Sequence, residues 1–90
     1  MLSVVIFGPR TKQMFDYVDH VKHLENTFNI EVSYCINKNT IMEWNIKQFP
    51  TIVVIYNGYY IAGREGAMTL SQLEEFLIYV GRVIQRDIFR

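Results

Sequence analysis

The chain has 90 residues, half of them apolar and 14% aromatic. This composition predicts one small globular domain over residues 1–90 and excludes a disordered chain. Nine Lys and Arg residues balance nine Asp and Glu residues, so we expect neither nucleic acid nor an anionic membrane as a partner, since both need excess basic charge.

The single cysteine, Cys35, excludes an intramolecular disulfide and is typical of a reducing compartment. The N-terminal apolar run, residues 2–7, is too short for the core of a signal peptide or for a membrane span. We therefore expect a soluble, cytoplasmic protein.

The first half of the chain predicts two strands separated by a helix. Residues 2–7 are typical of a buried strand, which Gly8 and Pro9 end. A helix is predicted from about Thr11 to Asn26, and residues 30–36 alternate as a second strand. The apolar faces are Met14, Val18, Val21 and Leu24 for the helix, and Ile30, Val32, Tyr34 and Ile36 for the strand. A strand, a helical crossover and a strand imply a parallel pair.

The second half predicts a short helix, a hairpin and a final helix. Residues 39–47 suit the short helix, with Asn39 or Thr40 as its cap. The apolar run 52–56 belongs at the centre of the sheet, and Asn57-Gly58 predicts a tight turn into a strand over 59–62. Thr69 and Gln72 fit a capping box. The buried stripe of the last helix is predicted as Leu70, Leu73, Leu77, Val80 and Ile84, with Phe76 and Val83 beside it.

The resulting order, β-α-β-(α)-β-β-α, predicts an α/β fold with a four-stranded mixed sheet and helices on both faces. Residues 34–77 also resemble the C-terminal half of the thioredoxin-like superfamily, which includes thioredoxins and glutaredoxins. The matching landmarks are Ile-Asn-Lys-Asn at 36–39, Ile-Lys-Gln-Phe-Pro-Thr at 46–51, Asn57-Gly58, Glu-Gly-Ala at 65–67 and Ser-Gln-Leu-Glu-Glu-Phe-Leu at 71–77. The resemblance implies a minimal thioredoxin-like fold.

The resemblance further implies that the bond before Pro50 is cis, which leaves the backbone of Phe49 free to pair with an extended peptide. Thioredoxins carry Cys-Gly-Pro-Cys at the start of the first core helix. One alignment places Phe-Gly-Pro-Arg at 7–10 there, and a glutaredoxin-style alignment places Lys-Gln-Met-Phe at 12–15 there. Both alignments lack cysteine, so the resemblance implies a degenerate member of the superfamily without the dithiol motif.

Cys35 is best interpreted as a small, partly buried filler, because it falls near the end of a strand and away from a helix N-terminus, where reactive thiols are found. His20 and His23 share a helix, but no further ligand completes a metal site. We expect neither a metal nor a cofactor. Trp44 suits either core packing or an exposed contact.

The sequence therefore predicts a redox-inactive protein, not an enzyme, that binds a protein or peptide partner beside Pro50. The predicted partner-binding residues are Gly8, Pro9, Arg10, Thr11, Lys12, Trp44, Phe49, Pro50 and Thr51. The alternative is a thiol-dependent oxidoreductase or a glutathione-binding glutaredoxin-like protein that uses Cys35 or no thiol of its own. A third hypothesis is self-association through Ile88 and Phe89. The richness in Ile, Asn, Lys and Tyr suits an AT-rich genome, such as that of a bacteriophage.

Overall fold

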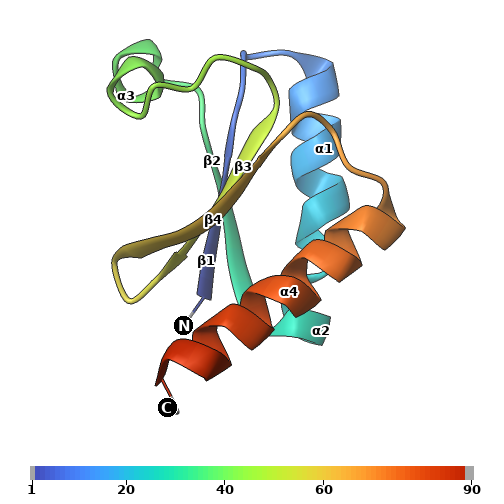
Figure 1. Cartoon of the computed structure of the whole chain (residues 1–90). Coiled ribbons are helices and arrows are strands. Elements are labelled where there is room, and N and C mark those ends of the chain that lie inside the picture. The colour runs from blue at the N-terminus through green and yellow to red at the C-terminus, as the bar shows by residue number, and fades with distance from the viewer. Residues whose placement is uncertain (1, 89–90) are drawn as a thin grey trace.

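The structure is a computed structural model that describes residues 2–88, and the side chains of residues 2–85. Four strands and four helices follow one another in this part of the chain (Figure 1). Their bounds are β1 (Leu2–Phe7), α1 (Lys12–Lys22), α2 (Glu25–Phe28), β2 (Ile30–Cys35), α3 (Lys38–Glu43), β3 (Thr51–Tyr56), β4 (Tyr59–Glu65) and α4 (Leu70–Ile88). The predicted contact through Ile88 and Phe89 lies outside the described side chains.

The strands form a mixed sheet in the order β2-β1-β3-β4. Strand β1 pairs in parallel with β2 and antiparallel with β3, and β3 pairs antiparallel with β4. The predicted fold class, the parallel pair and the central place of β3 are confirmed. The turn at Asn57 and Gly58, with φ of 50° and 83°, has the two left-handed residues that a tight hairpin needs.

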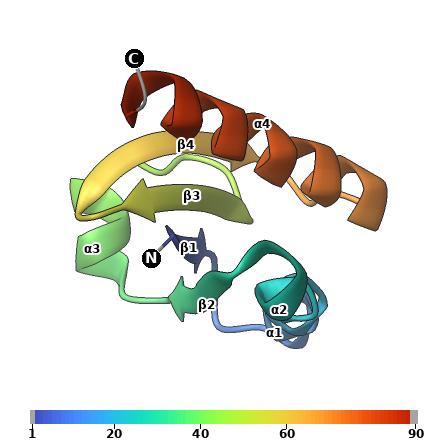
Figure 2. The same cartoon turned by 90° about the horizontal axis from the view of Figure 1, so that it is seen from below.

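Helices lie on both faces of the sheet, as predicted, but they cover the two faces unequally. Seen from below, α1, α2 and α4 lie on one side of the sheet and α3 on the other (Figure 2). The first face carries the main hydrophobic core, to which β1 contributes Val4 and Ile6 and α4 contributes Leu73 and Val80. The second face carries a small cluster of Phe7, Ile41 and Val53 under α3.

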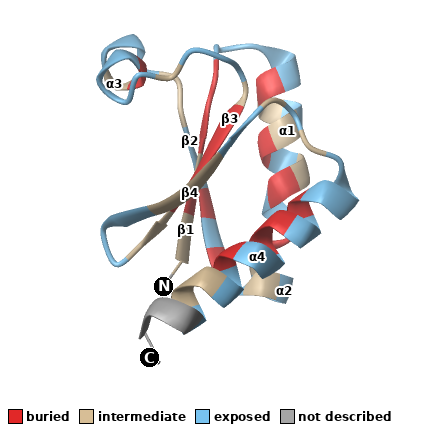
Figure 3. Ribbon diagram, viewed as in Figure 1, coloured by how far each residue is buried: buried red, intermediate tan, exposed pale blue. Residues whose placement is uncertain are grey.

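The buried residues lie where the repeat of apolar residues along each helix and strand places them (Figure 3). Met14, Val18, Val21 and Leu24 are all buried, as the predicted helical stripe requires. Strand β3 is buried on both faces from Thr51 to Val54. No helix within residues 2–88 is both long enough and apolar enough to cross a membrane.

The helix predicted from Thr11 to Asn26 is wrong at its C-terminal end. Helix α1 ends at Lys22, and a separate short helix, α2, begins at Glu25. The Glu25 carboxylate accepts a hydrogen bond from the Val32 N–H at 2.9 Å. This contact between α2 and β2 is tertiary, so the helical periodicity of the sequence did not reveal it.

The short helix and the last strand also differ from their predicted bounds. Helix α3 begins at Lys38 instead of Asn39, because the Asn37 side chain caps it by accepting from the N–H groups of Asn39 and Thr40 at 2.9 and 3.1 Å. Strand β4 continues to Glu65, three residues past the predicted end.

Tyr34, placed on the apolar side of its strand, and Leu70, assigned to the buried stripe of the last helix, are both exposed. Tyr34 is 48% exposed, and its ring packs edge-on against Phe15 of α1. Leu70 is 45% exposed, because the first turn of α4 extends beyond the strands (Figures 1 and 2). The capping box at this turn is confirmed, since Thr69 and Gln72 each donate a backbone N–H to the other's side chain.

Candidate functional site

A hollow of about 190 Å³ opens at the end of the sheet where β1 leads into α1 and β3 begins. We call it the Pro50 hollow. Apolar side chains and one amide line most of it. The lining residues are Pro9, Thr11, Gln13, Met14, Tyr17, Phe49, Pro50 and Ala67. Three segments far apart in the sequence therefore meet at one place.

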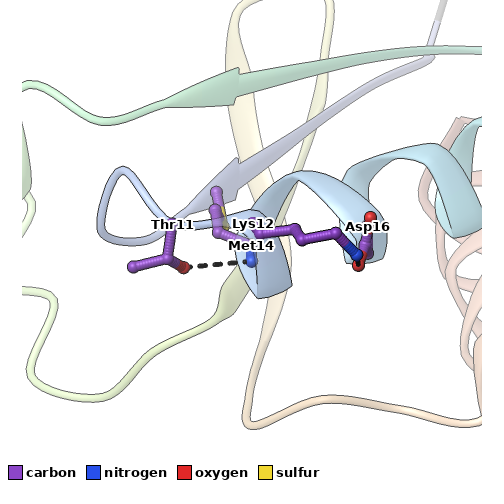
Figure 4. A network of polar contacts seen from close by, with 4 residues as sticks. All are labelled: Thr11, Lys12, Met14 and Asp16. Carbon is purple, nitrogen blue, oxygen red and sulfur yellow. Dashed lines mark hydrogen bonds and ion pairs between the residues drawn. The ribbon is translucent and has the colours of Figure 1, made fainter.

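The start of α1 forms one wall of the hollow. Thr11 caps the helix, and its hydroxyl accepts a hydrogen bond from the Met14 N–H at 3.2 Å (Figure 4). Such a cap satisfies one of the N–H groups that a helix start leaves without a partner. Lys12 pairs with Asp16 one turn later at 3.1 Å, on the solvent side (Figure 4).

Gly8 shapes the hollow from underneath. It is buried, and its N–H donates to the Cys35 carbonyl at 3.3 Å. A Cβ atom built at Gly8 would collide with the Met14 sulfur. The absent side chain of Gly8 therefore lets Met14 lie in the lining.

The opposite wall is the segment before β3. The bond between Phe49 and Pro50 is cis, and the Phe49 side chain is 47% exposed. The Pro50 carbonyl accepts from the Gly66 N–H at 2.8 Å. Within residues 2–88, the main-chain groups of Phe49 take part in none of the turn, loop or side-chain hydrogen bonds. Its N–H and C=O therefore have no such partner among the described residues.

Of the predicted partner-binding residues, Pro9, Thr11, Phe49 and Pro50 meet at this hollow. Gly8 lies beneath it, whereas Arg10 and Lys12 are exposed outside its lining. The buried Thr51 donates its hydroxyl to the Gln48 carbonyl at 2.6 Å and faces another hollow.

Four lining residues were not predicted, namely Gln13, Met14, Tyr17 and Ala67. Gln13 and Tyr17 are four residues apart, so they share one flank of α1 beside the buried stripe. Burial raises the pKa of the Tyr17 hydroxyl, and a hydrogen bond from the Met68 N–H at 3.2 Å acts in the opposite direction. The helical spacing could have indicated this flank, but not that residue 67 reaches it.

Trp44 lines a separate hollow of about 410 Å³ on the second face of the sheet. We call it the Trp44 hollow, and Tyr60, Val53 and Gly63 also line it. The Trp44 ring packs against Phe7 at a centroid distance of 5.7 Å, yet the residue is 40% exposed. Trp44 thus combines packing with an exposed surface, and it lies outside the Pro50 hollow.

Cys35 is half-buried and packs against the small cluster under α3, which confirms that it is partly buried. It is absent from the lining of the Pro50 hollow.

The two histidines of the first helix make local contacts. The His23 Nδ1 lies 2.7 Å from the Asp19 carbonyl, and the His20 ring stacks on Tyr17. Within residues 2–88, we find no group of three or more His, Cys, Asp or Glu side chains that could hold a metal ion.

The chain was compared with known proteins at the level of sequence and of structure. No family model and no curated protein matches the sequence. Among solved structures, a thioredoxin of Fasciola hepatica superposes with a TM-score of 0.71 at 20% identity, over 87% of this chain and 79% of that one. Mitochondrial thioredoxin 3 of Saccharomyces cerevisiae gives a TM-score of 0.70 at 18% identity, over 87% and 77%. The chain has a thioredoxin-like fold.

Two further structures share this fold. A designed protein has a TM-score of 0.73 at 17% identity, over 92% of this chain and 80% of the designed one. A malarial protein has a TM-score of 0.70 at 16% identity, over 88% and 94%. At sequence identities this low, the similarity to these four structures shows a shared fold and nothing more.

The two alignments of the degenerate motif lie on either side of a helix start. Residues 12–15 form the first turn of α1, whereas residues 7–10 end β1 and precede that helix.

Proposed function

We propose that this chain is a redox-inactive thioredoxin-like module that holds an extended peptide of a protein partner in the Pro50 hollow. The observation that carries the proposal is the hollow itself: it is largely apolar and lies beside the unpaired main chain of Phe49. A peptide can pair with Phe49 by main-chain hydrogen bonds while one apolar side chain enters the hollow.

The chemistry of the hollow supports binding more than disulfide exchange. Exchange begins with a thiolate that attacks a disulfide sulfur, and the lining of the Pro50 hollow contains no cysteine. Cys35, the single thiol, packs under α3 instead. The hollow is of the size and polarity that would accept an aliphatic or aromatic side chain.

A set of random linear peptides displayed on phage and selected on the full chain tests the proposal. We expect the selection to yield peptides that bind the Gln13→Trp variant of the chain about tenfold or more weakly than the wild type, because the indole fills the hollow. Lys22→Trp is the matched control, since Lys22 is also exposed on α1 but lies at its other end. If no selected peptide distinguishes the two variants, the proposed function is wrong.

Thioredoxins are usually oxidoreductases, so the competing function is thiol chemistry through Cys35 or binding of glutathione. Reduction of insulin disulfides by dithiothreitol, with and without the chain, separates the two. We expect no acceleration by the wild type. An acceleration that Cys35→Ser abolishes would assign the chain to the enzymes and contradict a redox-inactive module.

A further inference from the structure

Strand β4 is an edge of the sheet, and α4 runs beside it (Figures 1 and 2). A hollow of about 490 Å³ lies between them, lined by residues of both elements and of the loop that joins them. We call it the β4–α4 groove. An exposed edge strand beside a helix is the arrangement in which an extended peptide adds to a sheet.

The hydrogen-bond register shows which main-chain groups of β4 face outward. The Gly66 N–H donates to the Pro50 carbonyl, and bonded pairs alternate with non-bonded pairs in an antiparallel ladder. Arg64, opposite Ile52, therefore bonds to β3, whereas Gly63 and Glu65 belong to non-bonded pairs. The N–H and C=O groups of Gly63 and Glu65 point to the open edge.

This end of β4 lacks two of the features that usually shield an edge, namely Pro and a bulge. Charged side chains also shield edges, but the Arg64 side chain is turned towards the Phe76 ring of α4. The β3–β4 pairing does shift register, and the extra residue, Ile61, interrupts the first part of the strand. Residues 62–65 pair regularly and contain neither Pro nor Lys.

The charges of the groove favour a basic partner. Glu65 and Glu75 line the groove together with Arg64, whose guanidinium carbon lies 5.3 Å from the centre of the Phe76 ring. The groove thus has an excess of negative charge. Tyr79, which is 54% exposed, offers an apolar surface along which the methylene stem of a Lys or Arg can lie.

The other side of β4 adds a second, different recognition element. Arg64 and Glu65 also line the Trp44 hollow, whose walls include the exposed rings of Trp44 and Tyr60. Successive side chains of a strand point to opposite faces. A peptide paired with this end of β4 would direct one side chain towards α4 and the next towards Trp44.

We infer that the β4 edge is a second docking site, which takes an extended peptide of a partner protein as a fifth strand. The peptide places a basic side chain beside Glu75 of α4, and the adjacent apolar side chain in the Trp44 hollow. This site goes beyond the proposed function, and only Ala67 is common to the β4–α4 groove and the Pro50 hollow.

Peptides selected from the same phage-displayed library on the full chain test the inference, and fluorescence anisotropy measures their affinities. We expect a class of peptides in which a basic residue lies next to an apolar one. Glu75→Lys should weaken this class about tenfold or more. Glu74→Lys is the matched control, since Glu74 is also exposed on α4 but lies outside the groove, and it should change affinity by about threefold at most.

The main-chain contact is tested at Glu65. Glu65→Pro removes an outward N–H without taking a hydrogen bond from β3, whereas Glu65→Ala removes only the carboxylate. We expect Glu65→Pro to bind about tenfold more weakly than Glu65→Ala. Circular dichroism establishes that Glu65→Pro is folded, and Glu75→Lys tests the site independently of that variant.

The inference is overturned if no selected peptide responds to Glu75→Lys, including the case in which no peptide is selected. Peptides that respond to Gln13→Trp alone would support the Pro50 hollow and eliminate the β4 site. Light scattering supplies one more test. A dimer of the chain that Glu65→Pro converts to a monomer would mean that a second copy, and not a basic peptide, occupies the edge.

Discussion

The two faces of the sheet differ in what covers them. Helices α1, α2 and α4 bury the first face, whereas the short helix α3 covers part of the second (Figure 2). On the second face Trp44 and Tyr60 remain 40% and 59% exposed around an open hollow. The first face therefore holds most of the buried core, whereas the second leaves large aromatic side chains exposed.

The largest effect is expected from the core of the first face. Leu73 of α4 has no exposed surface, so Leu73→Ala leaves a cavity that the surrounding helices and strands cannot close. We expect the free energy of unfolding to fall by about 3–4 kcal/mol, as measured by urea denaturation. A loss below about 1 kcal/mol would contradict the role assigned to this face.

A smaller effect is expected under α3. Ile41 is 8% exposed and packs in the small cluster with Phe7 and Val53. Ile41→Ala should cost about 2 kcal/mol, since solvent and the adjacent side chains can partly fill the gap. Losses of equal size for Leu73→Ala and Ile41→Ala would remove the distinction between the two faces.

The smallest effect concerns Tyr17, which joins α1 to the loop before α4. Its hydroxyl accepts from the Met68 N–H at 3.2 Å, so Tyr17→Phe leaves that N–H without its acceptor. We expect a loss of about 1 kcal/mol at neutral pH. Tyr59→Phe is the control, because Tyr59 is 75% exposed on β4, and it should leave the stability unchanged.

The pH dependence of the same pair gives a second measurement. Burial raises the pKa of Tyr17 above its ordinary value of 10.0, so folding favours the neutral phenol. The stabilisation is complete at a pH below the pKa of Tyr17 in the unfolded chain. It is lost as the pH rises through the higher pKa of Tyr17 in the folded chain. Above pH 10, stability should therefore fall more steeply in the wild type and in Tyr59→Phe than in Tyr17→Phe.

The Pro50 hollow could be predicted in part. Pro9, Thr11, Phe49 and Pro50 were expected to lie together from the resemblance to thioredoxins, and the structure brings them to one hollow. Trp44 was expected at the same place and lies at another. A single tryptophan carries no periodicity that assigns it to a face, so its position depends on how α3 packs against Phe7.

The β4–α4 groove could not be predicted. Residues 64–65 and 72–79 are near in sequence, but the sequence was interpreted as a strand ending at Ala62 and a helix with Leu70 in its buried stripe. The structure extends β4 to Glu65 and leaves Leu70 exposed. The outward direction of the Gly63 and Glu65 main chain follows from the pairing register with β3, which no local pattern encodes.

The sequence by itself determined the order of the strands and of all helices except α2. It also determined the tight turn at Asn57-Gly58, the capping box at Thr69 and the lack of a cysteine pair. These are local properties, because each depends on backbone conformation or residue identity within a few positions. Only the tertiary structure decided that Gln13, Tyr17 and Ala67 join the Pro50 hollow, and that β4 is an open edge beside α4. Packing and strand pairing bring together residues whose separation along the chain conceals their proximity.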